Sequence, residues 1–163
     1  MKTMLIVYHT MTGGTQQMAQ AAAAGARRER EVAVWLKRAA DAVPQDVLAA
    51  DGFVFATPEN LGAMSGQMKD FFDRSYYAAL DRLNGKPYAT LVCAGSDGSL
   101  AAAQIERIAT GWRLRAVAEA VIVCTRAQTP EAILRPKRLE REDLRRCEEI
   151  GATLAAGLVM GIF

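Results

Sequence analysis

The sequence predicts an α/β fold, a doubly wound three-layer sandwich around a five-stranded parallel sheet of strand order 2-1-3-4-5. Two observations support this prediction. Five short apolar runs, typical of buried parallel strands, alternate with helical segments along the whole chain. No repeat, linker or low-complexity segment interrupts that alternation. Because 163 residues suffice for one sizeable core, we expect a single domain over residues 1–163.

The five strands are expected where apolar residues run together or alternate. They cover Met4–Tyr8, Glu31–Leu36, Gly52–Ala56, Pro87–Cys93 and Ala120–Cys124. Thr57-Pro58 is expected to end the third strand, which leaves Glu59–Met64 as a loop.

The helices are expected where apolar residues recur every three or four positions or where a start signal stands. They cover Gln16–Ala26, a short helix opening at Pro44, Ser65 to about Leu80, a helix capped by Ser96 or Ser99 and ending near Trp112, and Glu140 to about Leu158. Between the last strand and the last helix, Arg126–Leu139 reads as an irregular connection.

Composition excludes several classes of protein. The chain is 51% hydrophobic and 23% charged, which is typical of an ordered globular protein. A net charge of +2 is too small to indicate nucleic-acid or anionic-membrane binding. The three cysteines have no metal-ligand spacing, so no metal site is expected, and reduced thiols fit a cytoplasmic location. The N-terminal apolar run is too short for a signal peptide, and no stretch is long enough to span a membrane.

The turn after the first strand is the main candidate for binding. Thr10–Thr15 reads Thr-Met-Thr-Gly-Gly-Thr and leads into a helix, whose first N–H groups and dipole favour an anion. A P-loop would need a lysine after Gly14, and a dinucleotide fingerprint would need three spaced glycines; neither is present. A second interpretation stays open, in which the segment is only a glycine-rich turn with Thr10 or Thr12 as a cap.

Three turns are expected at the same edge of the sheet. They are His9–Thr15, Thr57–Met64 and Ala94–Gly98, each of which follows a strand. In open parallel sheets, ligands bind beyond the carboxyl ends of the strands, where the strand order reverses. The sequence therefore predicts one binding site that these turns share.

Two of these turns resemble known motifs. The Thr-x-Thr-Gly-Gly-Thr turn resembles the FMN-phosphate loop of the flavodoxin family. Residues 56–69, Ala-Thr-Pro-Glu-Asn-Leu-Gly-Ala-Met-Ser-Gly-Gln-Met-Lys, resemble a segment of the NAD(P)H-dependent FMN and quinone reductases, which have a flavodoxin-like fold. The resemblance covers 4–18, 57–74 and 86–112.

The resemblance implies an FMN site with the following residues. Around the phosphate it places His9, Thr10, Met11, Thr12, Gly13, Gly14 and Thr15. Along the isoalloxazine it places Pro58, Glu59, Asn60, Leu61, Gly62 and Met64, and at its pyrimidine side Ala94, Gly95, Ser96 and Gly98. It assigns no catalytic side chain, because the reaction takes place at flavin N5.

Two departures from carrier flavodoxins favour a reductase. Neither the second nor the third turn contains an aromatic residue to stack on the flavin, and the chain is slightly basic rather than acidic. An unstacked ring leaves room for a nicotinamide or a quinone. We therefore expect an FMN-dependent oxidoreductase that takes a hydride from NAD(P)H and reduces a quinone or similar small acceptor. A partner subunit of a homo-oligomer could complete the pocket.

Less specific interpretations of the chain and of two of its residues stay open beside the reductase. The chain could be a flavodoxin-like electron carrier without NAD(P)H turnover, or a scaffold that has lost FMN. His9 could donate to the phosphate or be a structural neighbour of the loop, and Glu59 could meet the flavin N–H edge or be a solvated loop acid.

Overall fold

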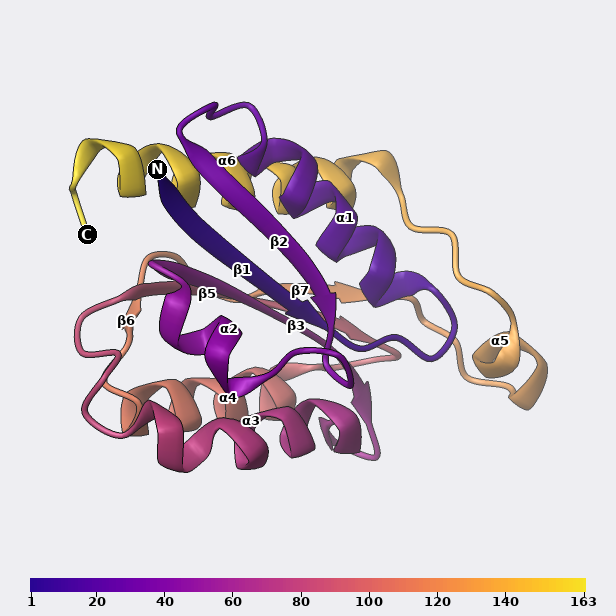
Figure 1. Ribbon diagram of the computed structural model, residues 1–163. Helices are drawn as coiled ribbons and strands as arrows, with labels where there is room; N and C mark the ends of the chain where they lie inside the picture. Colours follow the sequence, from indigo (N-terminus) through magenta and orange to yellow (C-terminus); the bar gives the residue numbers. More distant parts are fainter.

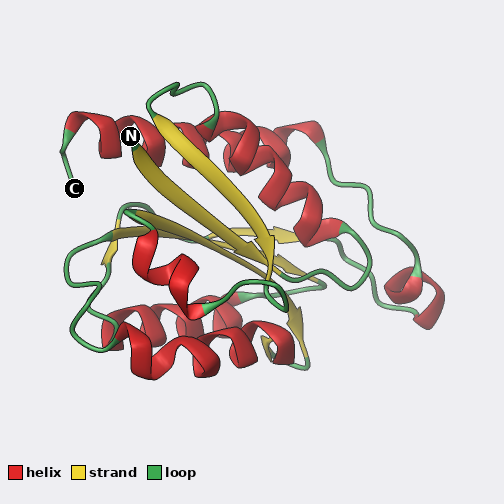
Figure 2. Cartoon of the chain, in the orientation of Figure 1, coloured by secondary structure: helices red, strands yellow, loops and turns green.

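The computed structural model describes residues 1–163 and shows a central sheet between two layers of helices (Figure 1, Figure 2). Helices α1 (Gly14–Ala26) and α6 (Arg141–Met160) cover one face of the sheet. Helices α2 (Pro44–Ala49), α3 (Gly66–Ala79) and α4 (Ser99–Gly111) cover the other. The short helix α5 (Pro130–Leu134) stands apart from both layers. None of these helices combines the length and apolarity needed to cross a membrane.

The sheet confirms the predicted strand order. Its long strands are β1 (Lys2–Tyr8), β2 (Val32–Arg38), β3 (Gly52–Asn60), β5 (Pro87–Ala94) and β7 (Val121–Cys124). They lie in the order β2-β1-β3-β5-β7, and all their pairings are parallel. A further two-residue strand, β6 (Arg115–Ala116), pairs with the start of β5 while β7 pairs with its end. The outer strand on this side is thus interrupted over residues 117–120.

Successive residues of each strand face opposite helix layers, which explains why the strands appear in the sequence as continuous apolar runs. In β1, Met4 and Ile6 pack under α1 and α6, whereas Leu5 and Val7 pack against the opposite layer. All four side chains are fully buried. A strand with helices on both faces has no side open to water, so both sets of positions must be apolar.

Helices α1 and α6 cross at a contact that only small residues allow. A Cβ added to Gly151 would lie 1.9 Å from the carbonyl oxygen of Ala22. A Cβ on Gly25 would likewise lie 1.9 Å from the carbonyl oxygen of Glu148. Any side chain at these two positions would push the two helices apart. It would thereby shift α1, whose first residues belong to the turn that follows β1.

The third strand is longer than the sequence predicted. β3 continues through Thr57 and Pro58, which pair with Val92 and Cys93 of β5, and ends only at Asn60. It then turns back into β4 (Ala63–Met64), which pairs antiparallel with Glu59 and Asn60. The prediction that Thr57-Pro58 ends the strand was wrong, because proline is tolerated here at the end of the parallel ladder, where the strand leaves the sheet.

Two helix starts test the capping predictions. Ser65 caps α3 as expected, since its hydroxyl oxygen accepts the N–H of Met68 at 3.3 Å. Neither Ser96 nor Ser99 caps α4; Gly98 holds that position, and the Ser99 hydroxyl donates to Asp97 at 2.7 Å instead. Ser99 is instead the first residue of the helix, one position past the cap.

Candidate functional site

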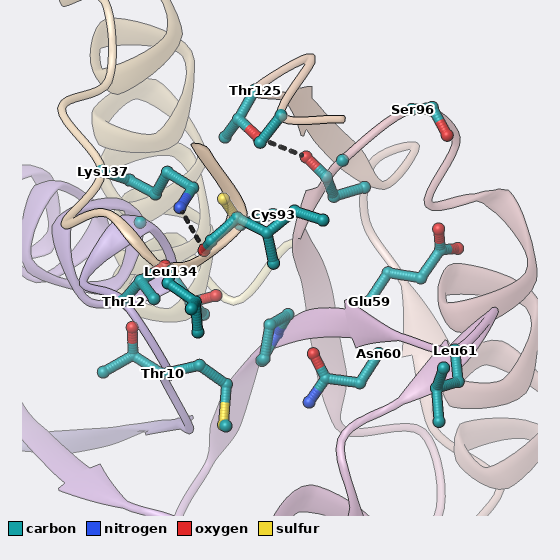
Figure 3. A pocket seen from close by; sticks show the side chains of 18 of the residues that line it. Thr10, Thr12, Glu59, Asn60, Leu61, Cys93, Ser96, Thr125, Leu134 and Lys137 are labelled. Atoms are coloured by element: carbon teal, nitrogen blue, oxygen red, sulfur yellow. Dashed lines mark hydrogen bonds between the residues drawn. The ribbon is translucent and has the colours of Figure 1, made fainter. Parts of the chain in front are cut away.

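A cavity of about 730 Å³ lies at the carboxyl ends of β1, β3 and β5. The three predicted turns surround it, and a fourth wall comes from the segment between β7 and α6 (Figure 3). Its size is within the usual range for a small-molecule or cofactor site. No Phe, Tyr or Trp lines it.

The first turn, Thr10–Thr15, packs closely against the neighbouring strand β5. Gly13 has a φ of 94°, a left-handed conformation that glycine adopts without strain, and its N–H donates to the Thr10 hydroxyl at 2.9 Å. Gly14 opens α1 directly behind it. A Cβ on Gly14 would lie 2.5 Å from the sulfur of Cys93, so the loop rests on β5 with no space between them.

Thr15 has an unused hydroxyl at the base of this turn. Its residue is 1% exposed, and Oγ1 has no hydrogen-bond partner within the protein. Thr15 also lines the cavity. Buried hydroxyls are almost always hydrogen-bonded, and a ligand in the cavity could supply an acceptor for this one.

His9 does not line the cavity. Its backbone N–H donates to the carbonyl oxygen of Ala56 at 3.1 Å, which ties the end of β1 to β3. Burial, and then the positive charge of Arg38, lower the pKa of its imidazole below the ordinary value. Both effects favour the neutral imidazole, whose Nδ1 is buried without a hydrogen-bond partner.

The second turn is a tight hairpin. Leu61 and Gly62 form its tip, with φ of 52° and 71°, the positive values that a two-residue turn between antiparallel strands requires. The Leu61 side chain is fully exposed and borders the cavity. A leucine held at positive φ carries backbone strain, a feature that concentrates at functional sites.

Buried polar contacts hold this hairpin in place. The Thr57 hydroxyl donates to the Pro58 carbonyl at 2.9 Å and accepts the N–H of Ser65 at 3.0 Å. The N–H of Met64 donates to the Gln104 side chain at 2.8 Å. Glu59, by contrast, has one buried carboxylate oxygen without a partner, and it borders the cavity.

The third turn is joined to the segment that follows β7. The Thr125 N–H and hydroxyl both donate to the carbonyl oxygen of Ala94, at 2.9 and 3.2 Å, and the N–H of Arg126 donates to that of Gly95 at 2.8 Å. Ala94, Gly95 and Ser96 line the cavity.

Most of the residues predicted for the site border one cavity. Those that line it are Thr10, Met11, Thr12, Gly14, Thr15, Pro58, Glu59, Asn60, Leu61, Gly62, Ala94, Gly95 and Ser96. Four others do not line it: His9, Gly13, Met64 and Gly98. Met64 faces the core below α3, and Gly98 is packed against Ile122. Whether the lining residues bind a flavin stays a prediction.

Sequence reasoning missed six lining residues. They are Cys93, Thr125, Ala127, Ile133, Leu134 and Lys137. Four of them (Ala127, Ile133, Leu134 and Lys137) come from the segment expected to be irregular, which contains α5. Thr129-Pro130-Glu131 is a helix-start signal that the sequence displays, and the Thr129 hydroxyl does accept the N–H of Ala132 at 3.2 Å.

Cys93 is the only thiol in the cavity wall, and its surroundings make it unreactive. Burial raises its pKa to about 11, and the positive charge of Lys137 only partly opposes that shift. The thiol therefore stays protonated at neutral pH, which suits a packing role and not that of a nucleophile.

Comparison with known families gives a match to the description "NADPH-dependent FMN reductase" over residues 29–127, more than half of the chain. A flavodoxin of Aquifex aeolicus is 44% identical over 73 residues, which cover 45% of this chain and 40% of that protein. A protein of Acidithiobacillus ferrooxidans named NAD(P)H dehydrogenase (quinone) is 34% identical over 95 residues, 46% of this chain and 48% of that one. These matches span less than half the length of either relative.

Solved structures share the fold. A flavodoxin from the domain Archaea superposes with a TM-score of 0.78 at 18% identity, over 96% of this chain and 99% of the other. A WrbA-like flavodoxin from Agrobacterium tumefaciens gives 0.77 at 21% identity, over 98% and 99%. The fold is flavodoxin-like, as the motifs implied, and the chain belongs to the NADPH-dependent FMN reductase family.

Proposed function

We propose that the cavity binds FMN and that the protein is an oxidoreductase that takes a hydride from NAD(P)H and reduces a quinone or a similar small acceptor. The observation that supports this most directly is the buried, unpartnered hydroxyl of Thr15 in the wall of the cavity, at the start of α1. A phosphate at that helix end would supply the missing acceptor and would interact favourably with the dipole of the helix.

The residues present fit an FMN phosphate at this end of the cavity. The Thr10 hydroxyl accepts the N–H of Gly13, so its own proton remains free to donate. Thr12 and Thr15 add two further hydroxyls, and the first N–H groups of α1 have no intrahelical acceptors. The turn itself thus supplies a set of donors, without a cation, that suits a dianion.

The hairpin and the third turn fit a flavin ring. Pro58–Gly62 line the cavity from one side, and the small residues Ala94–Ser96 line it from another. The unpartnered carboxylate oxygen of Glu59 lies among them and could accept from a ring N–H. This is the pattern of a site that is largely apolar and fixes its ligand with a few polar groups.

When bound, FMN supplies the hydride chemistry at N5, and the protein contributes placement and access. No side chain of the cavity needs to act as a general acid or base. The absence of aromatic residues from the wall leaves room for a second planar molecule beside the flavin. The relative named NAD(P)H dehydrogenase (quinone) supports a nicotinamide donor and a quinone acceptor.

An electron carrier is the second candidate, because the Aquifex relative carries the name flavodoxin. A carrier would bind FMN in the same cavity but would depend on a separate reductase. The aromatic-free cavity and the net charge of +2 favour the reductase.

Two measurements test the proposal. Titration with FMN, followed by the flavin absorption band, should show saturable binding. Oxidation of NADH and NADPH by the loaded protein should then be fast only when a soluble quinone is present. A protein that leaves the FMN spectrum unchanged contradicts the site. One that binds FMN but turns over neither nucleotide, while accepting electrons from an added reductase, is a carrier.

A further inference from the structure

The segment from Arg126 to Leu139 forms one wall of the cavity without being part of either helix layer. Its helix α5 has no buried residue and projects away from the sheet (Figure 1). Ile133 and Leu134 line the cavity, yet their side chains are 51% and 75% exposed. Hydrophobic burial therefore contributes little to holding α5 in position.

Hydrogen bonds hold the segment instead, and they join it to the Thr-Gly turn. The N–H of Lys137 donates to the carbonyl oxygen of Thr12 at 2.8 Å. The Gln17 amide group donates to the carbonyl oxygens of Gly13 and Lys137, at 2.9 and 2.8 Å, and its oxygen accepts the N–H of Leu139 at 3.1 Å. Apart from the bond between Gln17 and Gly13, these contacts link residues about 120 positions apart in the sequence.

The Lys137 side chain extends this connection to α5. Its ammonium donates to the carbonyl oxygens of Ala132, Ile133 and Arg135, at 2.9, 2.7 and 2.6 Å. These are the carbonyls at the end of α5, where a cation is favourable. Figure 3 shows the Lys137 ammonium with one of these hydrogen bonds as a dashed line. All three ammonium donors are thereby used.

We propose that Lys137 is a positioning residue: its backbone is fixed to the turn that would hold the phosphate, and its side chain fixes α5, so that Ile133 and Leu134 form a defined apolar wall against the bound flavin. This proposal rests on the proposed FMN function. Lys137 is also the only cation in the cavity wall. A direct contact with the phosphate is disfavoured because its donors are already taken by the three carbonyls.

Riboflavin has the flavin ring but no phosphate. Comparing its binding with that of FMN therefore distinguishes a residue that positions α5 from one that contacts the phosphate. In Lys137→Met, we expect the affinities for FMN and riboflavin to fall by the same factor, about tenfold, as loss of charged hydrogen bonds at a partly exposed site would give. The thermal midpoint should stay unchanged, because no residue of α5 is buried in the core. Arg135→Met is the matched control: it removes one positive charge from the same segment, and its side chain has no hydrogen bond or ion pair.

Amide hydrogen exchange of the flavin-free protein gives a readout that needs no ligand. The N–H groups of Ile133 and Arg135 donate within α5, to Thr129 and Glu131. They should exchange at least about tenfold faster in Lys137→Met than in the wild type or in Arg135→Met, with the sheet unchanged. Lys137→Arg should not restore slow exchange, since a planar guanidinium cannot direct three donors from one atom.

Three results would overturn the proposal. One is unchanged exchange in α5. Another is an affinity loss confined to FMN and rescued by Lys137→Arg, which would make Lys137 a phosphate ligand. The third is a fall in thermal midpoint that accounts for the weaker binding. A wild-type protein that binds neither flavin would contradict the proposed function itself, a result visible before any variant is compared.

Discussion

Gly14 and Cys93 lie so close that a Cβ on Gly14 would stand 2.5 Å from the Cys93 sulfur. The two residues belong to different neighbouring elements, the start of α1 and the end of β5. Their contact sets how deeply the Thr-Gly turn sits at the edge of the sheet, and it makes glycine necessary at position 14 for reasons of space.

Gly14→Ala should destabilise the protein by about 1–3 kcal/mol, the usual cost of overpacking, and should weaken FMN binding because the turn is displaced. Urea unfolding and a flavin titration measure both effects. Gly111→Ala is the control, since a Cβ there meets nothing within 4 Å. Combining Gly14→Ala with Cys93→Ala should recover much of the loss, and a double variant no better than the single one would show that the sulfur is not the obstacle.

Thr15→Val should leave folding stability nearly unchanged, because the hydroxyl that it removes has no partner in the protein. FMN affinity should fall roughly 10- to 100-fold, as for the loss of a hydrogen bond to a charged group, while riboflavin affinity stays the same. Thr57→Val is the contrasting variant: its hydroxyl is bonded to Pro58 and Ser65, so it should lose stability by about 1–3 kcal/mol. Equal losses for FMN and riboflavin in Thr15→Val would argue against a phosphate at this position.

Gly151→Ala should destabilise the protein strongly, by about 3 kcal/mol or more, because its methyl group would overlap the backbone oxygen of Ala22, which cannot move without shifting α1. Gly66→Ala, in an open position on α3, should be neutral or slightly stabilising. Urea midpoints of the two variants give the comparison. If Gly151→Ala unfolds at the wild-type midpoint, the close helix crossing is not needed for stability.

Stability should decrease as the pH rises above about 9. Burial raises the pKa of the Cys93 thiol to about 11 and that of Cys147 to about 12, above the ordinary value of 9.0. Between pH 9 and the raised pKa of each thiol, the unfolded chain loses thiol protons that the folded protein keeps. The free energy of unfolding therefore falls with a slope of about 1.4 kcal/mol per pH unit for each thiol. Cys147→Ala should show a shallower decline than the wild type between pH 9 and 11. Parallel curves for the two proteins would mean that the buried thiol is not responsible.

The layers and the sheet order could be predicted because they follow from local patterns. Apolar runs mark strands buried on both faces, as in Met4–Tyr8, and parallel strands joined by helices leave few topologies. The three turns could be placed at one edge for the same reason. Their threonines and glycines also carried the family resemblance.

The features that were missed depend on contacts between distant residues. The extension of β3 past Pro58 comes from its pairing with β5, which local propensity does not report. Lys137 reaches the cavity because Gln17 and Thr12 hold its backbone, across 120 positions of sequence in the case of Gln17. The helix α5, in contrast, had a readable start signal at Thr129-Pro130, but its five residues are too few to display a helical period.

The broken outer strand affects how the protein behaves at high concentration. β6 and β7 form the border of the sheet beyond β5. They are only two and four residues long and are separated by a gap. A neighbouring molecule therefore finds no long row of unsatisfied N–H and C=O groups to extend there, and growth of a continuous intermolecular sheet from this border is discouraged.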